Sequence, residues 1–353
     1  MIDIVDLTLE ELTQQIVQLG LEPYRARQIF LFIHRHHVES FEKISVLKKG
    51  IREQLAELFS IPRLKLVNEV DAEDGTRKFL FELDDSNRIE SVLIPMRDGK
   101  KTICVSTQVG CRMRCRFCAT GQMGFKRNLR TSEIVLQVYQ IMDLCNIKTP
   151  NIVYMGMGEP LDNYENVIKS LKILTNPEGA NISKRRITLS TCGITPALRR
   201  LKKDMPHINM ALSLHSAIDE KRSLLMPINK KYPLGEILKE LKDFPIPRRK
   251  RITFEYVMID GINDTNQDRK ALLKLLSNFK SKLNIIPLNR HDSIDESLQP
   301  TPEQRIEEFA DYLRKKGMFV TIRDSKGSSI KAACGMLATK GSSDSVKMRK
   351  GNS

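Results

Sequence analysis

The stretch TICVSTQVGCRMRCRFC, residues 102–118, joins a short apolar run to a loop that carries Cys111, Cys115 and Cys118. Three thiolates this close together can face one inorganic centre, and thiolates suit zinc or iron–sulfur clusters. A structural zinc usually takes four protein ligands, whereas the local set here stops at three. A cubane cluster held by three cysteines keeps one iron open for chemistry. We therefore favour a catalytic cluster on this loop over a structural zinc or a purely structural cluster.

The chain beyond residue 100 alternates short apolar runs with amphipathic helical stretches. This repetition predicts a parallel sheet with crossover helices, either open or curled into a barrel. The predicted strands are 102–106, 151–156, 186–190, 208–214, 252–259, 283–287 and 318–322. The predicted helices include 132–145, 164–174, 266–279 and 302–315. Because such barrels carry their chemistry at the carboxyl ends of the strands, residues that follow the strands are candidate site residues.

The first part of the chain has a different pattern. Apolar positions at helical spacing predict a small helical domain with helices over 9–19, 24–37 and 47–59. The hydrophobic period then changes to two in 78–83 and 90–95, with a turn at 84–87, which predicts a β-hairpin linker. The last residues are rich in Ser, Gly and Lys and predict a disordered tail. The domains that we expect are 1–62, 63–98, 99–340 and 341–353.

Composition narrows the class of protein. The chain has 353 residues and a formal charge of +15, and its basic clusters at 184–186, 199–203 and 248–251 favour binding to nucleic acid. Solvated helix ends explain each cluster equally well. The acidic N-terminus lacks the features of a signal peptide, and no apolar run is long enough to span a membrane. Seven cysteines, an odd number, argue against a disulfide framework. We therefore expect a cytoplasmic protein that does not associate with membranes.

Several further motifs follow one another along the chain. They are 104–111, 155–160, 188–191, 213–215, 225–229 and 332–335. With the cysteine loop, they resemble the radical S-adenosylmethionine (SAM) superfamily and, within it, the RlmN family of adenine-C2 methyltransferases that act on 23S rRNA and tRNA. The resemblance covers nearly the whole chain, including 23–28 in the helical domain. Several motifs in order are more specific than the three cysteines alone.

The resemblance implies a fold and two cofactors. The fold is α/β, a partial (β/α)6-type radical SAM barrel with an N-terminal helical accessory domain that helps to grip RNA and a short β-hairpin linker. The cofactors are a [4Fe-4S] cluster on the three cysteines and SAM. The implied SAM contacts are Gly158, Glu159, Ser190, Ser213, Leu214, His215 and Asn289. From the residues alone, a tight turn with a capping acid explains Gly158 and Glu159, and a structural hydrogen bond explains His215.

The resemblance also implies a mechanism. Carbon 2 of adenine carries no acidic proton, so a radical route is required. Cys334 accepts a methyl group as a thiolate and then joins covalently to the adenine, Glu90 takes the C2 proton, and Cys104 releases the product. From sequence alone, Glu90 is equally well an ordinary solvated strand acid and Cys334 a buried small residue. The chain departs from the family pattern at Cys192, where serine is expected, and at Lys331, where an acid is expected.

Two alternatives remain open. One is a Cfr-type methyltransferase that modifies carbon 8 of adenine, against which Pro160 and 94–96 argue modestly. The other is a non-catalytic RNA-binding protein that holds structural zinc or an iron–sulfur cluster. As partners we expect 23S rRNA, tRNA and a small flavin or iron–sulfur electron donor, and we expect a monomer. The resemblance further implies a disulfide bond.

Overall fold

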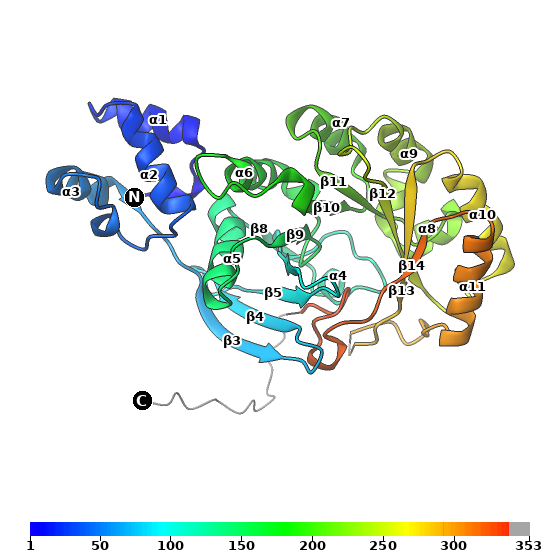
Figure 1. Ribbon diagram of the computed structural model, residues 1–353. Helices are drawn as coiled ribbons and strands as arrows, with labels where there is room; N and C mark the ends of the chain where they lie inside the picture. The colour runs from blue at the N-terminus through cyan, green and yellow to red at the C-terminus, as the bar shows by residue number, and fades with distance from the viewer. Residues whose placement is uncertain (292, 339–353) are drawn as a thin grey trace.

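The computed structural model describes residues 1–291 and 293–338, which contain one large sheet of ten strands in the order β14-β13-β12-β11-β10-β9-β6-β5-β4-β3 (Figure 1). From β6 to β14 all neighbouring strands are parallel. The parallel strands are β6 (Lys101–Cys104), β9 (Asn151–Tyr154), β10 (Ile187–Thr191), β11 (Asn209–Ser213), β12 (Ile252–Met258), β13 (Ser281–Pro287) and β14 (Val320–Ile322). Every predicted strand beyond residue 100 is confirmed, with small shifts at the ends.

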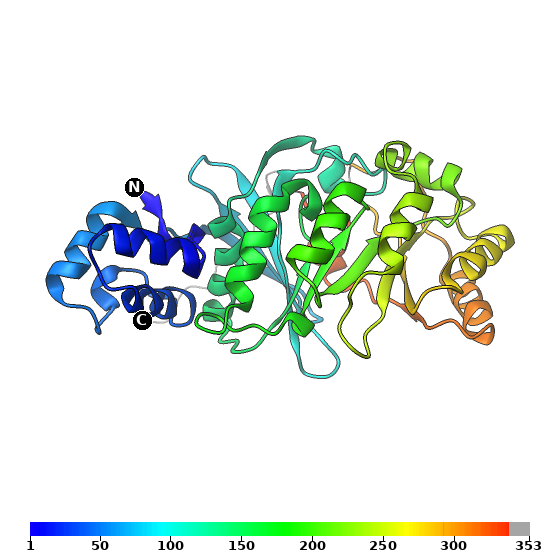
Figure 2. The same ribbon diagram turned by 90° about the horizontal axis from the view of Figure 1, so that it is seen from above.

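Helices connect the parallel strands and lie along the outer face of the curved sheet (Figures 1 and 2). They are α5 (Thr131–Leu144), α6 (Tyr164–Thr175), α7 (Thr195–Asp204), α8 (Asp219–Leu225), α9 (Leu234–Lys242), α10 (Asn266–Leu276) and α11 (Glu303–Lys315). Each crossover joins two neighbouring parallel strands, so six strand–helix units precede β14. This arrangement confirms the predicted α/β fold with a partial (β/α)6-type barrel.

An antiparallel extension continues the sheet on the β6 side. It consists of β3 (Lys65–Asp71), β4 (Arg77–Glu82) and β5 (Arg88–Pro95). Strands β4 and β5 are the predicted hairpin, and β5 pairs with β6 so that Val92 lies opposite Cys104. The hairpin is therefore part of the main sheet, with β3 added as a third strand. This register brings the β5 residue Glu90 close to the start of the barrel.

The N-terminal helices form a small body at one end of the molecule, beside α5 and α6 (Figure 1). They are α1 (Leu9–Gln18), α2 (Tyr24–His34) and α3 (Lys49–Leu58), and the strands β1 (Ile2–Asp3) and β2 (Phe59–Ser60) pair beneath them. A capping box between Thr8 and Glu11 starts α1. Nδ1 of buried His34 lies 3.1 Å from the hydroxyl of Tyr139 on α5, which ties this body to the barrel.

A short ribbon holds the cysteine loop. Strands β7 (Gln108–Gly110) and β8 (Phe125–Asn128) pair antiparallel, and α4 (Ala119–Gln122) lies between them. Gly110 has φ +74°, and an added Cβ would lie 1.8 Å from the Gly124 carbonyl oxygen, so only glycine fits. The cysteines therefore project from a constrained loop at the mouth of the barrel.

Short 3-10 helices complete the described elements: Ile4–Asp6, Phe41–Lys43, Pro160–Asn163, Lys184–Arg186, Pro227–Lys230 and Ser328–Ile330. Within the described residues, no helix has the length and apolar character needed to cross a membrane. The tail predicted at 341–353 lies outside the described residues.

Candidate active site

The three loop cysteines line one cavity together with residues at the carboxyl ends of the parallel strands. Burial raises the pKa of the Cys111 thiol to about 12, and burial followed by the charges of Cys118 and Cys111 raises the pKa of Cys115. The three sulfurs therefore influence one another electrostatically across a shared space. Without a bound centre they are neutral thiols, and binding of iron would replace their protons.

The donor set at this cavity fits a cluster. In a cubane cluster each cysteine binds a different iron atom, so the sulfurs surround the cluster instead of converging on one ion. In the part of the chain that the structure describes, no three His, Cys, Asp or Glu side chains converge as the ligands of a single ion would. Three thiols that line one cavity without converging on a single point fit the predicted cluster loop better than a closed zinc site.

Gly158 and Glu159 follow β9 and line the same cavity. Gly158 has φ +97°, and an added Cβ would lie 2.5 Å from the Gln108 Cβ, so this position requires glycine. The Glu159 carboxylate accepts hydrogen bonds from the Thr191 hydroxyl at 2.7 Å and the Cys192 N–H at 2.9 Å. Burial raises the pKa of Glu159, and these donors oppose that shift. Glu159 thus joins the ends of β9 and β10 while facing the cavity.

Ser190, Ser213, His215 and Asn289 also line this cavity, as the sequence predicted for the ends of successive strands. His215 is buried, its Nδ1 accepts the Val257 N–H at 3.0 Å, and burial lowers its pKa to about 3. Its ring is therefore neutral, with the proton on Nε2.

Leu214 differs from the other predicted SAM contacts because its side chain lies in the main core. Its N–H donates to the Glu255 carbonyl at 3.0 Å, and its own carbonyl accepts from Nε of Arg222 at 3.1 Å. Leu214 therefore positions neighbouring backbone. It is not among the residues that line the cavity of the three loop cysteines, which we call the cluster cavity.

The segment carrying Cys334 lies across the mouth of the barrel. Cys334 lines both the cluster cavity and a second, larger cavity, as do Glu255, Asn289 and Arg323, so the two cavities adjoin at these residues. Asn289 Nδ2 donates to the Cys334 carbonyl at 3.2 Å, and the Ala119 N–H donates to the Gly335 carbonyl at 2.7 Å. The Thr120 hydroxyl donates to the Leu337 carbonyl at 2.7 Å. These bonds order the segment although Lys331 replaces the acid that we expected.

The second cavity occupies about 680 Å³ inside the barrel, within the range of small-molecule sites. Cys104, Cys334, Arg323 and Glu255 all line it. Burial and then the Cys334 charge raise the pKa of Cys104 to about 12, although the Arg323 guanidinium opposes this shift. Burial also raises the pKa of Cys334, and Arg323 again opposes the shift. Cys104 and Cys334 therefore share one cavity with a cation that favours their thiolates.

Sequence reasoning missed Arg323 and Glu255. Arg323 directly follows the predicted strand 318–322, which is a signal that points to the carboxyl end of the sheet. Glu255 stands inside β12, where an acid in an apolar run is the corresponding signal. Its carboxylate accepts from Asn284 Nδ2 at 2.6 Å, and burial raises its pKa.

Glu90 is buried on β5 and is not among the residues lining either cavity. Its carboxylate lies 3.0 Å from the Lys78 ammonium and accepts the Ala338 N–H at 2.9 Å. Burial raises the pKa of Glu90, and Lys78 lowers it. The alternative of a solvated strand acid is therefore wrong. Glu90 therefore contacts the segment that carries Cys334, through the hydrogen bond from the Ala338 N–H.

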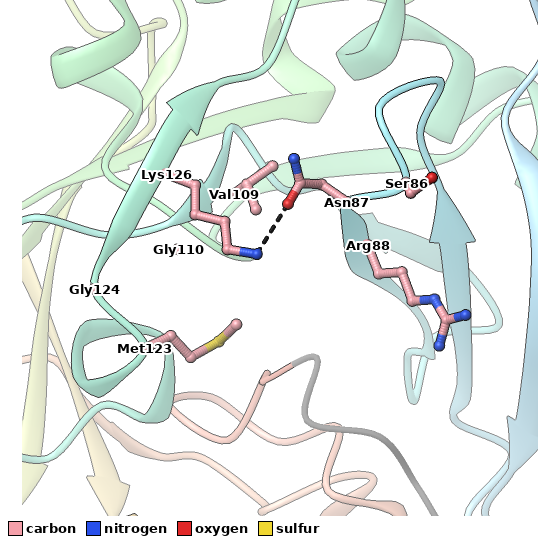
Figure 3. A pocket seen from close by; sticks show the side chains of 8 residues that line it. All are labelled: Ser86, Asn87, Arg88, Val109, Gly110, Met123, Gly124 and Lys126. Carbon is pink, nitrogen blue, oxygen red and sulfur yellow. Dashed lines mark hydrogen bonds between the residues drawn. The ribbon is translucent and has the colours of Figure 1, made fainter.

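A further cavity of about 150 Å³ lies between the β4–β5 turn and the β7–β8 ribbon (Figure 3). Lys126 lines it and donates to the Asn87 side chain at 3.0 Å, and Arg88 lines it and pairs with Glu82 at 3.0 Å. No cysteine, histidine or acid is among its described lining residues. It therefore lacks groups for the predicted chemistry.

The basic clusters lie away from the cysteines. Residues 184–186 and 248–251 precede β10 and β12 and so stand at the amino ends of the sheet. In the third cluster, on α7, Arg199 and Lys202 both pair with Glu240, at 2.9 and 3.0 Å. Glu240 therefore neutralises part of that cluster's charge.

Two aromatic residues, Phe117 and Phe125, lie near the cysteines in the chain, and aromatic rings of this kind can stack on a base. Phe117 is buried, with its ring edge-on to His215 at 4.6 Å. Phe125 is half-buried and carries the Arg112 guanidinium 3.8 Å above its ring. Phe117 therefore packs in the core. The ring of Phe125 is covered by the guanidinium of Arg112, which belongs to the cysteine loop.

The barrel and the cysteine loop define a radical SAM enzyme. Residues 105–276 match the family model described as the radical SAM superfamily. A crystal structure of a radical SAM methyltransferase from Sphaerobacter thermophilus superposes with a TM-score of 0.89 at 39% identity, over 96% of this chain and 100% of that one. The cofactors of this class are a [4Fe-4S] cluster and SAM.

The N-terminal body narrows the class. Residues 2–61 match the ribosomal RNA large subunit methyltransferase N-terminal domain. The dual-specificity RNA methyltransferase RlmN of Syntrophotalea carbinolica is 46% identical over 96% of this chain and 90% of that protein. The corresponding protein of Geobacter sulfurreducens is 44% identical over 98% of this chain and 94% of that protein. The chain belongs to the RlmN family of RNA methyltransferases, and the C8-methylating and non-catalytic alternatives are not favoured.

The cysteines correct one expectation. All seven are free thiols. The disulfide bond that the family resemblance implied is therefore not supported.

Proposed function

We propose that this chain methylates carbon 2 of adenine in 23S rRNA and in tRNA, through a methylated cysteine at position 334. Relatives of nearly full length carry the name dual-specificity RNA methyltransferase. The observation that carries the proposal is that Cys334 lines both cavities. The three loop cysteines line one of them, Cys104 lines the other, and Arg323 lines both.

Cys111, Cys115 and Cys118 would hold the [4Fe-4S] cluster. Gly158, Glu159, Ser190, Ser213, His215 and Asn289 would contact SAM, and Leu214 would act through its backbone. When bound, these cofactors supply the methyl group and the radical chemistry that an unactivated carbon requires. The neutral His215 donates a hydrogen bond from Nε2, and the carboxylate of Glu159 accepts one.

Cys334 is the nucleophile, since a thiolate sulfur accepts a methyl group by displacement and becomes a neutral thioether. Arg323 favours that thiolate. Once the methylated sulfur is joined to adenine, Glu90 accepts the C2 proton, which requires its contact with the Ala338 N–H to open. Cys104 then attacks the sulfur of Cys334, because the two face the same cavity. The bond from that sulfur to the methylene carbon breaks, the carbon takes a proton and becomes the methyl group of the released RNA, and Cys104 and Cys334 remain joined by a disulfide that a thiol or other external reductant must open before the next turnover.

The substrate base must leave its stack to reach Cys334, and the larger cavity offers a place for an extruded adenine. We assign 1–62 to RNA binding, 63–98 to the link between domains and 99–340 to catalysis. We further propose a cytoplasmic monomer that is reduced by a small flavin or iron–sulfur protein.

The test is anaerobic reconstitution with iron and sulfide, followed by reaction with ribosomal RNA and tRNA in the presence of SAM and a reductant. Mass spectrometry of the nucleosides distinguishes 2-methyladenosine from 8-methyladenosine. We expect a brown protein that forms 2-methyladenosine. A colourless protein that binds zinc, or formation of the 8-methyl product, would overturn the proposal.

A further inference from the structure

Arg222 is a fully buried cation beside the cysteine loop. It lies on α8 with 0% exposure, and α8 contacts that loop directly because the Arg116 N–H donates to the Leu225 carbonyl at 3.0 Å. Nη2 donates to the carbonyls of Cys192 at 2.7 Å and Ser213 at 3.0 Å. Both of these residues line the cluster cavity.

All acceptors of the Arg222 guanidinium are neutral. Besides the two carbonyls, Nε donates to the Leu214 carbonyl at 3.1 Å and Nη1 donates to the Asn229 side-chain oxygen. Among residues 1–291 and 293–338, no carboxylate lies within ion-pair distance of this guanidinium. The hydrogen bonds are satisfied, but the charge is not compensated.

An uncompensated charge away from water is unfavourable by several kcal/mol. Burial accordingly lowers the pKa of Arg222, and the nearby sulfurs of Cys192 and Cys115 oppose this shift more strongly than the carboxylate of Asp219 does. The sulfurs of Cys192 and Cys115, which are neutral thiols without a bound centre, are therefore the groups whose ionisation would compensate this cation most. Three cysteine thiolates around a cluster would supply negative charge at Cys115, on the same side as Arg222.

We propose that Arg222 is the counter-ion of the [4Fe-4S] cluster and a positioning residue that sets its reduction potential. Reduction adds one negative charge to the cluster, and a fixed cation stabilises the reduced form more than the oxidised form. Arg222 therefore makes the cluster easier to reduce. The inference rests on the proposed function because it requires the cluster to bind at these cysteines.

Two variants remove the net charge in different ways. Arg222→Gln deletes the cation, whereas Asn229→Asp keeps it and places a carboxylate oxygen where Nη1 already donates. Asn229→Ala is the matched control. It removes the hydrogen bond between Arg222 Nη1 and the Asn229 side chain, as Arg222→Gln does, but it leaves the positive charge of Arg222 in place. The potential of each reconstituted protein is measured by a redox titration followed by electron paramagnetic resonance, and the melting temperature of each cluster-free protein is measured alongside.

We expect Arg222→Gln and Asn229→Asp each to shift the redox equilibrium at least tenfold toward the oxidised cluster, which is about 59 mV for one electron. Asn229→Ala should shift it less than twofold. Asn229→Asp should also raise the melting temperature of the cluster-free protein, because the buried cation gains a partner. A purely structural role would lower stability in all three variants and leave the potential unchanged.

The outcomes separate this inference from the proposed function. Suppose that the wild type binds a cluster and that the redox equilibrium constant of each charge variant differs from the wild-type constant by less than twofold. In that case Arg222 is not the counter-ion. If Arg222→Gln does not fold, Asn229→Asp alone decides, since it preserves side-chain shape. A wild type that takes up no iron and sulfide would overturn the proposed function and this inference with it.

Discussion

Replacing Arg323 with methionine tests how Cys334 becomes a nucleophile. Arg323 is the cation that opposes the effect of burial on the pKa of Cys334, and it also faces Glu255, whose negative charge raises that pKa. An opposite charge at close range typically shifts a pKa by about 1–3 units. Arg323→Met removes this contribution and leaves Glu255 uncompensated. We expect the pKa of Cys334 to rise by about 1–3 units, and each unit lowers the thiolate fraction about tenfold at a pH below the pKa.

The assay is alkylation of Cys334 in the cluster-free protein by iodoacetamide, read by mass spectrometry of its peptide over about pH 6 to 10. The rate at a fixed neutral pH should fall about tenfold or more, and the midpoint of the pH profile should move upward. Arg323→Lys keeps the charge and should stay closer to the wild type. A midpoint that moves by less than about 0.3 unit in Arg323→Met would refute this electrostatic role for Arg323.

Further predictions concern three other positions and the nucleophile itself. Cys334→Ala should abolish RNA methylation while SAM cleavage remains measurable, and methylated RNA from this variant would contradict the role of Cys334. Cys104→Ala should trap a protein–RNA adduct on a denaturing gel, whereas free methylated product would contradict it. Cys192→Ser should retain its iron content. The backbone N–H and carbonyl of Cys192 make the bonds to Glu159 and Arg222, and a serine hydroxyl can replace the contact between the thiol and Glu159. Loss of most of the iron would contradict this expectation. Burial lowers the pKa of His34 from 6.5 to about 3, so its contribution to stability is complete above pH 6.5 and is lost as the pH falls toward 3. The difference in unfolding free energy between wild type and His34→Gln should therefore narrow on acidification, and a constant difference would contradict it.

The parallel sheet was predictable because its strands are apolar runs separated by helices with clear periodicity. Strand β12, for example, is buried along nearly its whole length, and its sequence is apolar apart from Thr253 and Glu255. Strand β3 was not predicted as a separate element. It alternates between exposed and half-buried residues and contains three charged positions in Lys65–Asp71, so its pattern resembles that of a surface loop. Pairing with β4, rather than local sequence, defines it.

The site shows the same division between local and long-range information. The cysteine spacing identified the cluster loop, and the strand ends identified most residues of its cavity. Arg222 was missed because its helix, Asp219–Leu225, is rich in charge and reads as an exposed segment. Only the tertiary structure turns this arginine inward, against carbonyl groups of Cys192 and Ser213 from two other strand ends. A buried arginine whose hydrogen-bond partners are backbone groups far away in the sequence does not alter the hydrophobic periodicity of its own segment, so the sequence does not reveal it.

The Cys334 segment is held by the element that follows the cluster cysteines. Helix α4 begins at Ala119, one residue after Cys118, and its Ala119 N–H and Thr120 hydroxyl bond the carbonyls of Gly335 and Leu337. A cluster that binds Cys118 fixes the start of α4 and, through these bonds, the segment that presents Cys334. Further along the same segment, the Ala338 N–H donates to the Glu90 carboxylate. In the proposed function, these hydrogen bonds would connect cluster binding at Cys118 with the position of Cys334 and the exposure of Glu90, because each bond joins the segment to a different part of the site.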